Sequence, residues 1–403
     1  ASLRISIVVP AYRTKKEHLE AMLNSVSRQS YPHWELIVAD AGGTAESVQA
    51  WAKKNGICLR EAADASNLAE WKDQSIVLSP LSENKGISAN TNAGIGLAAG
   101  DAVGLLDHDD LLTANALWEM ADCLEKEKKR GKQKLVLFSD EDKCDGAASR
   151  FYEPNFKPDF DGELLLTNNY ICHFTVIETA FLKELKLRSG FDGAQDYDLM
   201  LRAYAAGGQF VHVPKVLYHW RCHEASTASN PQSKRYAYEA GQRALEDYCL
   251  RKGWKATVSG LKHLGFYRED YEDSVFCQRP EIGIWAKPLP GGRDILGIRH
   301  PKGFLVSGLY ENDGSMRYAG LRKGYSGPMH RAALQQSAPA ADLRSMEVCS
   351  ALKERYAQTI AELKEACQGL PTAAQEKKIL QKSMEFCKEA TAAGYGILWD
   401  PQA

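Results

Sequence analysis

The stretch from Val103 to Leu112 constrains the fold more than any other part of the chain. Val103–Leu106 is a short apolar run, which is typical of a strand buried in a parallel sheet. Three carboxylates, Asp107, Asp109 and Asp110, follow it almost at once. Because ligands of open α/β sheets bind beyond the carboxyl ends of such strands, we expect these side chains at the mouth of a site.

The spacing of the carboxylates indicates a cation. In an extended segment Asp107 and Asp109 point the same way, and clustered carboxylates repel unless a proton or a cation lies between them. Mg²⁺ or Mn²⁺ is the simplest choice, because each takes one or two carboxylates together with the phosphates of a substrate. Taken alone, so short a pattern is more often a solvated acidic turn, and other motifs in the chain are needed to distinguish the two interpretations.

The N-terminal segments alternate between strand and helix patterns. Residues 5–9 predict a strand closed by Pro10, residues 15–29 a helix, and residues 34–40 a second strand that stops on Asp40. Such alternation predicts an α/β fold with a mostly parallel sheet. Right-handed crossovers then place the loops after the strands along one edge, which gathers Pro10, Tyr12, Asp40 and Asp107.

Asn84-Lys85-Gly86 opens a predicted helix of small residues that ends near Gly94. It is no Walker A loop, because the lysine precedes the glycine, and Pro10-Ala11-Tyr12 lacks the glycines of a Rossmann dinucleotide site. A nucleotide still fits at this edge, with Asp40 accepting from its base or ribose. For Tyr12, stacking on a ligand and capping the sheet both stay open.

Short motifs follow one another in a characteristic order over about the first 260 residues. They are Val8-Val9-Pro10-Ala11-Tyr12, the strand-final Asp40, Glu83-Asn84-Lys85-Gly86, Asp107-His108-Asp109-Asp110, Phe138-Ser139-Asp140-Glu141, Asn168-Asn169-Tyr170-Ile171, Asp192-Gly193-Ala194-Gln195-Asp196 and Tyr218-His219-Trp220-Arg221. In this order they resemble family 2 glycosyltransferases of GT-A fold, of the bacterial type that builds surface polysaccharides. The chain departs from the family after Asp40, where a second acidic residue and a serine are more usual.

The resemblance implies an inverting, metal-dependent hexosyl- or deoxyhexosyltransferase that uses Mn²⁺ or Mg²⁺. A UDP- or dTDP-sugar would be the donor, and a hydroxyl of a lipid-linked or protein-linked glycan the acceptor. Asp196, in the first turn of a predicted helix, would be the base that deprotonates the acceptor. The implied metal residues are Asp107, Asp109 and His219. The implied donor-binding residues are Pro10, Tyr12, Asp40, Asn84, Lys85, Gly86, Asp107, His108 and Arg221, the last as a fork for the leaving diphosphate.

The remaining segments give weaker expectations. Residues 151–170 are rich in Phe, Tyr, Pro, Asn and Asp and are expected to form an ordered loop. Residues 205–214 are echoed by 392–401, but the echo lacks the predicted base. We therefore expect a transferase domain over 1–260 and, over 261–403, a degenerate partial second one with helices at 351–366 and 375–391. Its expected roles are packing, dimer formation or holding the acceptor.

Composition excludes several classes of function. A formal charge of −2 gives no global reason to bind nucleic acid, and no apolar run reaches the roughly 20 residues of a membrane helix. The ten cysteines are scattered, as in a reduced cytosolic protein. We expect a cytoplasmic enzyme, peripheral at the inner membrane face, whose N-terminus is a strand rather than a signal peptide. Whether the chain is part of a longer protein stays open.

Two other functions compete with this interpretation. A nucleotide-sugar-binding protein that has lost catalysis would fit the degraded echo, although Asp107, Asp109 and Asp196 are intact. A nucleotidyltransferase also uses paired carboxylates and a metal on an α/β sheet. It normally has a Gly-rich phosphate loop near the first strand, and residues 10–16 contain no glycine.

Overall fold

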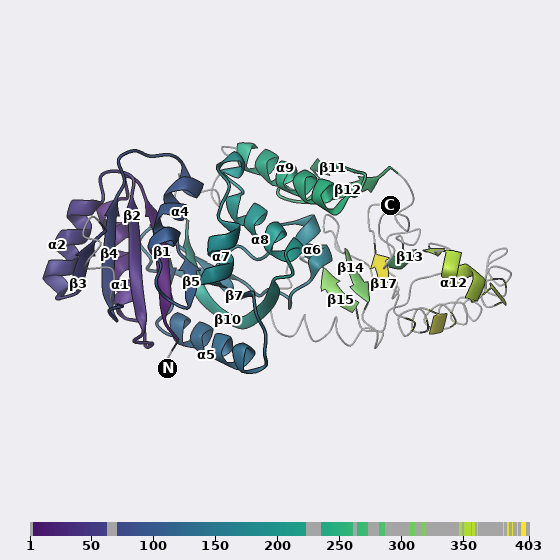
Figure 1. Ribbon diagram of the computed structural model, residues 1–403, viewed down its shortest axis with the longest axis horizontal. Helices are drawn as coiled ribbons and strands as arrows, with labels where there is room; N and C mark the ends of the chain where they lie inside the picture. Colours follow the sequence, from purple (N-terminus) through teal and green to yellow (C-terminus); the bar gives the residue numbers. More distant parts are fainter. Residues whose placement is uncertain are drawn as a thin grey trace. The chain divides into compact units, whose positions relative to one another are not determined.

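A computed structural model gives the fold of the chain (Figure 1). It describes residues 3–62, 71–222, 235–260 and 264–272, and beyond these 282–286, 307–310, 316–319, 346–348, 350–355, 396–399 and isolated positions between 357 and 393. The chain divides into two compact units, one of residues 1–160 and 169–248 and the other of residues 161–168 and 249–403. The expected boundary after residue 260 stays a prediction.

The first unit is built on a ten-stranded sheet. Its main path runs β3 (Cys58–Glu61), β4 (Ser75–Pro80), β2 (Trp34–Asp40), β1 (Ile5–Ala11), β5 (Ala102–Leu105), β9 (Thr175–Glu178), β7 (Leu135–Cys144), β10 (Gln209–Arg221) and β6 (Leu111–Leu112), and β8 (Phe151–Asn155) pairs with β7. The strands from β3 to β5 are parallel, whereas β9, β6 and β8 pair antiparallel with their neighbours. The predicted α/β fold with a mostly parallel sheet is therefore confirmed.

Helices cover both faces of this sheet. One face packs its side chains, such as Ile7, against α1 (Lys16–Ser27), α2 (Ala45–Asn55) and α5 (Ala116–Lys129) in a single buried core. The other face meets α4 (Ile87–Leu97) so closely that a Cβ at Gly94 would lie 2.6 Å from Val8. Because both faces are buried, β1 and β2 are mostly apolar, and their polar residues Ser6 and Glu35 are buried and hydrogen-bonded to each other.

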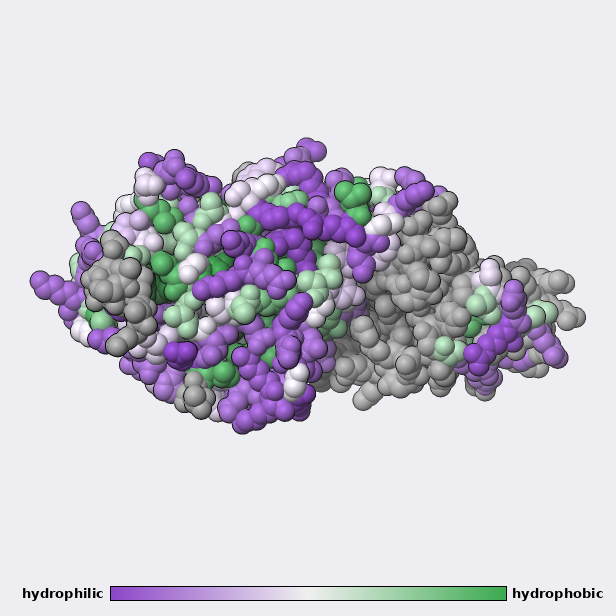
Figure 2. Space-filling view, viewed as in Figure 1, coloured by the Kyte–Doolittle hydropathy of each residue, from purple (hydrophilic) through white to green (hydrophobic). Residues whose placement is uncertain are grey.

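The α4 side also carries α7 (Thr179–Leu185), the short 3₁₀ helix η1 (Ser189–Phe191) and α8 (Gln195–Ala205), which follow one another along the chain. Helix α9 (Arg235–Lys252) comes next along the chain. On the face seen in Figure 2, hydrophilic side chains predominate over the described part of the first unit, and hydrophobic ones form small separate groups. Within the described residues, none of the helices combines the length and the apolar composition that crossing a membrane requires.

The expectation of a loop over residues 151–170 is wrong in two places. Residues Phe151–Asn155 form β8, because the preceding strand β7 is longer than expected and offers a free edge for antiparallel pairing. Residues Gly162–Thr167 form α6, whose leucines are buried. Tertiary contacts here override a composition that is poor in helix and strand formers.

The second unit contains two small sheets. Strands β11 (Ala256–Gly260) and β12 (Tyr267–Tyr271) pair antiparallel. The other sheet runs β15 (Met316–Ala319), β14 (Ser307–Tyr310), β17 (Gly396–Trp399), β13 (Ile282–Ala286) and β16 (Met346–Val348). Strand β17 begins where the internal echo aligns Gly396 with Gln209, the first residue of β10. Helix α12 (Ser350–Arg355) overlaps the start of the helix expected at 351–366, whereas most of the one at 375–391 lies outside the described residues.

Candidate active site

The acidic segment after β5 is a turn, not the extended strand end that we expected. The backbone N–H of Asp110 donates to the carbonyl of Asp107 over 3.3 Å, which closes the turn. The turn brings residues i and i+3 together, so the carboxylate that joins Asp107 is that of Asp110. The segment turns because the chain has to reverse direction here, so that β6 can pair antiparallel with β10.

Asp110 is anchored from two sides. One carboxylate oxygen accepts from the Tyr218 hydroxyl at 2.5 Å, and the other accepts from the backbone N–H of Arg221 at 2.7 Å. Burial, with the charges of Asp107 and Asp109, raises the pKa of Asp110 well above its usual value. Asp110 therefore connects the end of β10 to the acidic turn.

Within the described residues, one group of side chains has the geometry to hold a metal ion. Ligand atoms of Asp107, Asp110 and His173 all lie within 4.8 Å of one another. The two carboxylates suit Mn²⁺ or Mg²⁺, and the imidazole can join them only through a ring nitrogen that has lost its proton. Asp107 is 46% exposed, so a substrate phosphate can reach a bound ion. Loss of hydration and the charges of Asp109 and Asp196 raise the pKa of Asp107, although His173 and His108 oppose this, and a cation would relieve that excess of negative charge.

A buried ionic network holds His173 in place. Its Nδ1 lies 3.1 Å from Glu141 Oε2, and its ring stacks on Tyr218. The fully buried Lys157 donates to the same carboxylate oxygen at 3.3 Å and to the carbonyl of Ile171 at 2.6 Å. Burial lowers the pKa of His173, but the hydrogen bond and charge of Glu141 outweigh it and raise that pKa to about 9. Burial acts the other way on Glu141, yet Lys157 and His173 lower its pKa to about 2.

Removing the charge of Glu141 should destabilise the fold. In Glu141→Gln, Lys157 keeps its charge at a fully buried position but loses the carboxylate that lies 3.3 Å from its Nζ. We expect the free energy of unfolding to fall by about 3 kcal/mol in urea titrations near pH 7. Glu83→Gln removes a carboxylate from an exposed pair with Lys85, at 64% exposure on both sides, and should change stability by less than about 1 kcal/mol. Equal effects of the two substitutions would show that the buried network contributes nothing.

The same network predicts a dependence on pH. Because the folded-state pKa of Glu141 is depressed to about 2 from an ordinary value of 4.5, its contribution is present above the ordinary value. Stability should decline as the pH falls from there toward 2, and Glu141→Gln should lose less over that range than the parent chain does. Urea midpoints measured at pH 3 and pH 6 for both proteins test this.

Asp196 lies beside this cluster at the start of α8. Its Oδ2 accepts a hydrogen bond of 2.7 Å from the side-chain amide of Asn169. Its charge raises the pKa of Asp107, and both carboxylates raise the pKa of the half-buried Cys172, so the two acids lie around the same cysteine. Asp198, two positions on, faces elsewhere and is bound by Arg188 and by Arg202, the latter at 2.9 Å.

The ends of β1 and β2 form a second part of this edge. Asp40 is buried, and its carboxylate accepts from the backbone N–H groups of Gly42, Thr44 and Ala45 at the start of α2. Both carboxylate oxygens already accept these backbone hydrogen bonds, and a contact of Asp40 with a nucleoside stays a prediction. Tyr12 is 39% exposed, its ring lies against Gly42, and the Arg13 guanidinium carbon lies 5.0 Å from the ring centroid. Its stacking on a base stays a prediction. Pro10 immediately precedes this corner in β1.

Gly86 connects this edge to the segment before α8. Asn84 holds the loop by accepting from the Gly86 N–H at 3.1 Å, while Lys85 points to Glu83. Beyond Gly86, the N–H of Ser88 donates to Asp192 over 3.3 Å. Asp192 therefore joins the first turn of α4 to the residues that precede the predicted base.

Gly86 should not tolerate a side chain. It has φ +93°, and a Cβ there would lie 2.2 Å from Oδ2 of Asp192. Gly86→Ala should lower the free energy of unfolding by roughly 1–3 kcal/mol, because it strains the backbone and displaces Asp192. Gly96→Ala, in the helix α4 that Gly86 precedes, is the matched control, since no atom lies within 4 Å of its Cβ position. Thermal unfolding of both variants tests this, and an equal midpoint for the two would contradict it.

The other residues predicted from the motifs lie around the acidic turn but not all within the metal cluster. His219 sits on β10 and pairs with Asp142 at 2.5 Å, and its ring contacts Phe151. Arg221 is buried and donates to the carbonyls of Asp109 and Gly146. Its Nη2, like Nδ1 of His108, is buried without a hydrogen-bond partner among the described residues. The metal role of His219 and Asp109 and the donor role of Arg221 and His108 stay predictions.

Three contributors were missed in the sequence. Lys157 and Asn169 lie in the segment 151–170, which was expected to be a loop, and His173 follows that segment. The motif Asn168-Asn169-Tyr170-Ile171 was a signal for this region, but nothing in the sequence paired its second asparagine with Asp196. His173 stands two residues beyond that motif, in the turn before β9.

These features define the first unit as an α/β domain with an acidic site beyond the carboxyl ends of its strands. Residues 6–185 match the family described as "Glycosyl transferase family 2". This segment therefore belongs to the family 2 glycosyltransferases, which confirms the resemblance seen in the motifs, and the sheet described above is the GT-A fold expected from it.

Several curated proteins are similar to the chain. An uncharacterized protein of Sinorhizobium fredii is 36% identical over 255 residues, 62% of this chain and 26% of that protein. The O-antigen biosynthesis protein RfbC of Myxococcus xanthus is 35% identical over 256 residues, 63% of this chain and 19% of RfbC. The chain thus spans about a quarter or less of these relatives. Among solved structures, S. aureus TarS 1-349 in complex with UDP-GlcNAc is 20% identical, with a TM-score of 0.45 over 62% of this chain and 67% of TarS.

Proposed function

We propose that this chain is an inverting, metal-dependent glycosyltransferase that moves a sugar from a nucleotide-diphosphate donor to a hydroxyl of a glycan acceptor. One observation carries the proposal: ligand atoms of Asp107, Asp110 and His173 lie within 4.8 Å of one another, which is close enough to hold a divalent ion. Asp196, whose charge acts on the pKa of Asp107, supports the assignment of a base beside that ion. Membership of residues 6–185 in the transferase family supports the same conclusion.

The residues divide the reaction between them. Asp107, Asp110 and His173 would hold the divalent ion, which supplies positive charge against the diphosphate of the donor. Asp196 would take the proton of the acceptor hydroxyl as its oxygen attacks the anomeric carbon and the bond to the diphosphate breaks. Asn169 donates to one oxygen of Asp196 and so keeps the carboxylate oriented toward the acceptor.

The residues of the site and the similar proteins support the proposed classes of donor and acceptor. Exposed Tyr12 offers a face for a base, and the acidic cluster with a metal suits a diphosphate. RfbC acts in O-antigen biosynthesis and AmsB of Erwinia amylovora, 27% identical over 233 residues, in amylovoran biosynthesis. We therefore propose a UDP- or dTDP-sugar as donor and a growing bacterial polysaccharide as acceptor.

A panel of nucleotide sugars tests this proposal. The chain is incubated with UDP- and dTDP-hexoses and deoxyhexoses, with Mn²⁺ or with EDTA, and both thermal stabilisation and release of nucleoside diphosphate are measured. We expect at least one donor to stabilise the chain and to be hydrolysed slowly, in both cases only with the metal. Stabilisation without any hydrolysis or transfer would favour the alternative of an inactive nucleotide-sugar-binding protein. No response to any donor would refute both.

A further inference from the structure

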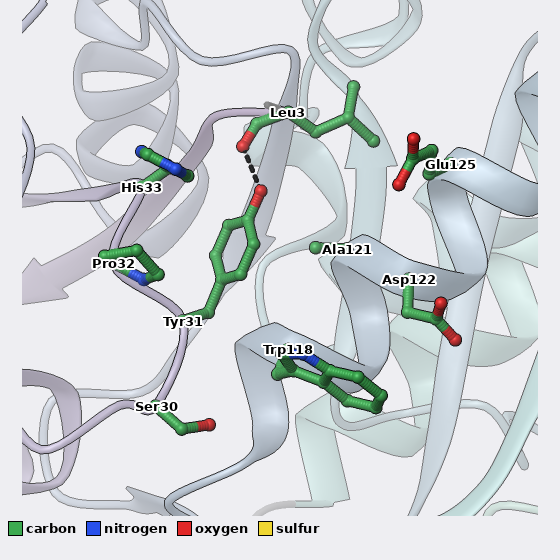
Figure 3. Close-up of a pocket in the computed structure, with 9 residues that line it drawn as sticks. All are labelled: Leu3, Ser30, Tyr31, Pro32, His33, Trp118, Ala121, Asp122 and Glu125. Atoms are coloured by element: carbon green, nitrogen blue, oxygen red, sulfur yellow. Dashed lines mark hydrogen bonds between the residues drawn. The ribbon is translucent and has the colours of Figure 1, made fainter. Parts of the chain in front are cut away.

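A pocket of about 700 Å³ lies at the edge of the sheet opposite the acidic site (Figure 3). Leu3 precedes β1 and His33 precedes β2, so the pocket lies at the amino ends of these strands, whereas Tyr12 and Asp40 lie at their carboxyl ends. The seven residues of β1 separate the two places by roughly 20 Å. Its lining is Leu3, Ser30, Tyr31, Pro32, His33, Trp118, Ala121, Asp122 and Glu125.

One face of α5 forms a wall of this pocket. Trp118, Ala121, Asp122 and Glu125 follow the i, i+3, i+4, i+7 spacing of a single helix face. Ala121 is also part of the buried core, together with Leu117 and Leu124 on the adjoining face of α5. Trp118 is 48% exposed, and among the described residues its indole has neither a hydrogen-bond nor a ring partner. Figure 3 shows that this ring and that of Tyr31 line the pocket from different elements.

The pocket is held in shape without a ligand. The Tyr31 hydroxyl donates to the carbonyl of Leu3, which fixes the ring (Figure 3). Gln29, just before the loop, donates to the carbonyl of Thr113 at 2.7 Å and accepts from the Leu117 N–H at 2.9 Å. These bonds tie the loop to the start of α5, so a ligand would lose little affinity to ordering the protein.

The charges around the pocket are balanced. Asp122 is paired with Lys126 at 2.6 Å, and Glu125 with Lys129 at 2.8 Å. None of the described lining residues is itself Lys or Arg, which disfavours a phosphate. The paired carboxylates offer little net attraction to a cation, yet they keep lone pairs that accept hydrogen bonds from hydroxyl groups.

We propose that this pocket binds an uncharged oligosaccharide, a part of the glycan away from the end that is extended. A sugar ring presents C–H groups that pack on Trp118 and Tyr31, and hydroxyls that bond to Asp122 and Glu125. The volume is within the range of ordinary small-molecule sites. The inference rests on the proposed function for the identity of the glycan, because a polysaccharide-building transferase must hold a long acceptor.

Calorimetric titration with cellotriose, maltotriose and chitotriose tests the site without any need for catalysis. We expect millimolar or tighter binding of at least one of them, weakened at least roughly tenfold in Trp118→Ala and less in Trp118→Phe. Leu250→Ala, which removes another exposed hydrophobic side chain at 77% exposure, should leave the affinity unchanged. Trp118 is exposed, so thermal unfolding should be unaltered in Trp118→Ala.

Three results would overturn the proposal. They are the absence of binding by all three saccharides, binding that survives Trp118→Ala, and binding of spermidine or inorganic phosphate in place of the saccharides. Failure of the proposed function is seen separately, because nucleotide-sugar hydrolysis is measured at the other edge of the sheet and should be the same in Trp118→Ala as in the parent chain.

Discussion

Replacing Asp196 by asparagine is expected to lower the rate of sugar transfer by about 10²–10⁴-fold, the usual contribution of a positioned general base. Asparagine is nearly the same size, and its carbonyl oxygen can still accept from the Asn169 amide as Asp196 does now at 2.7 Å. The local structure should therefore persist while the proton acceptor is lost. Affinity for the donor, held by other residues, should change little.

The measurement is release of nucleoside diphosphate with the donor that the panel identifies, together with a calorimetric titration of the same donor. Asp198→Asn is an informative companion in the same helix. Its carboxylate pairs with Arg188 and Arg202 rather than facing Asp107, so its loss should lower thermal stability more than the turnover of folded protein. Full activity of Asp196→Asn would refute its assignment as the base.

Replacing Asp107 by asparagine is expected to abolish metal-dependent donor binding, with affinity for UDP in Mn²⁺ falling by roughly 100-fold or more. Asp107 is the exposed carboxylate of the cluster. Both oxygens of Asp110 already accept hydrogen bonds, one from the Tyr218 hydroxyl and the other from the Arg221 N–H. The folded structure should therefore survive the loss of Asp107 better than the loss of Asp110. Chelation by EDTA should reproduce the effect in the parent chain.

Two histidines distinguish the metal ligands inferred from the sequence motif from those inferred from the geometry. His173 lies 4.0 Å from Asp107, whereas His219 is paired with Asp142. If the cluster of Asp107, Asp110 and His173 binds the ion, His173→Asn should weaken Mn²⁺ binding at least tenfold more than His219→Asn does. The reverse order would restore the ligand set inferred from the motif. Donor affinity that is unchanged by EDTA would remove the metal from the account.

The fold was largely predictable because its strands are buried on both faces. β1, β2 and β5 are mostly apolar, and Asp40 at the end of β2 and Asp107 after β5 marked the edge of the site. The segment between Phe151 and Thr167 was not predictable from composition, because pairing with β7 and burial of its leucines decide its structure.

The site was predictable only in part, because its contacts join residues far apart in sequence. Asp107 and Asp196 could be placed at one edge from motifs and strand ends. No local pattern indicated that Asn169 would bind Asp196, or that Lys157 and Glu141 would hold His173. We expected Asp109 to lie beside Asp107, but the turn places Asp110 there instead, because the chain reverses so that β6 can pair with β10.

The anomeric configuration of the first product tests the central claim most directly. Proton NMR follows the hydrolysis of an α-linked UDP-sugar by the parent chain with Mn²⁺, before the free sugar mutarotates. In-line attack assisted by a single base at Asp196 predicts that the β anomer appears first and that Asp196→Asn suppresses its formation. Initial release of the α anomer, at a rate that Asp196→Asn leaves unchanged, would contradict the account.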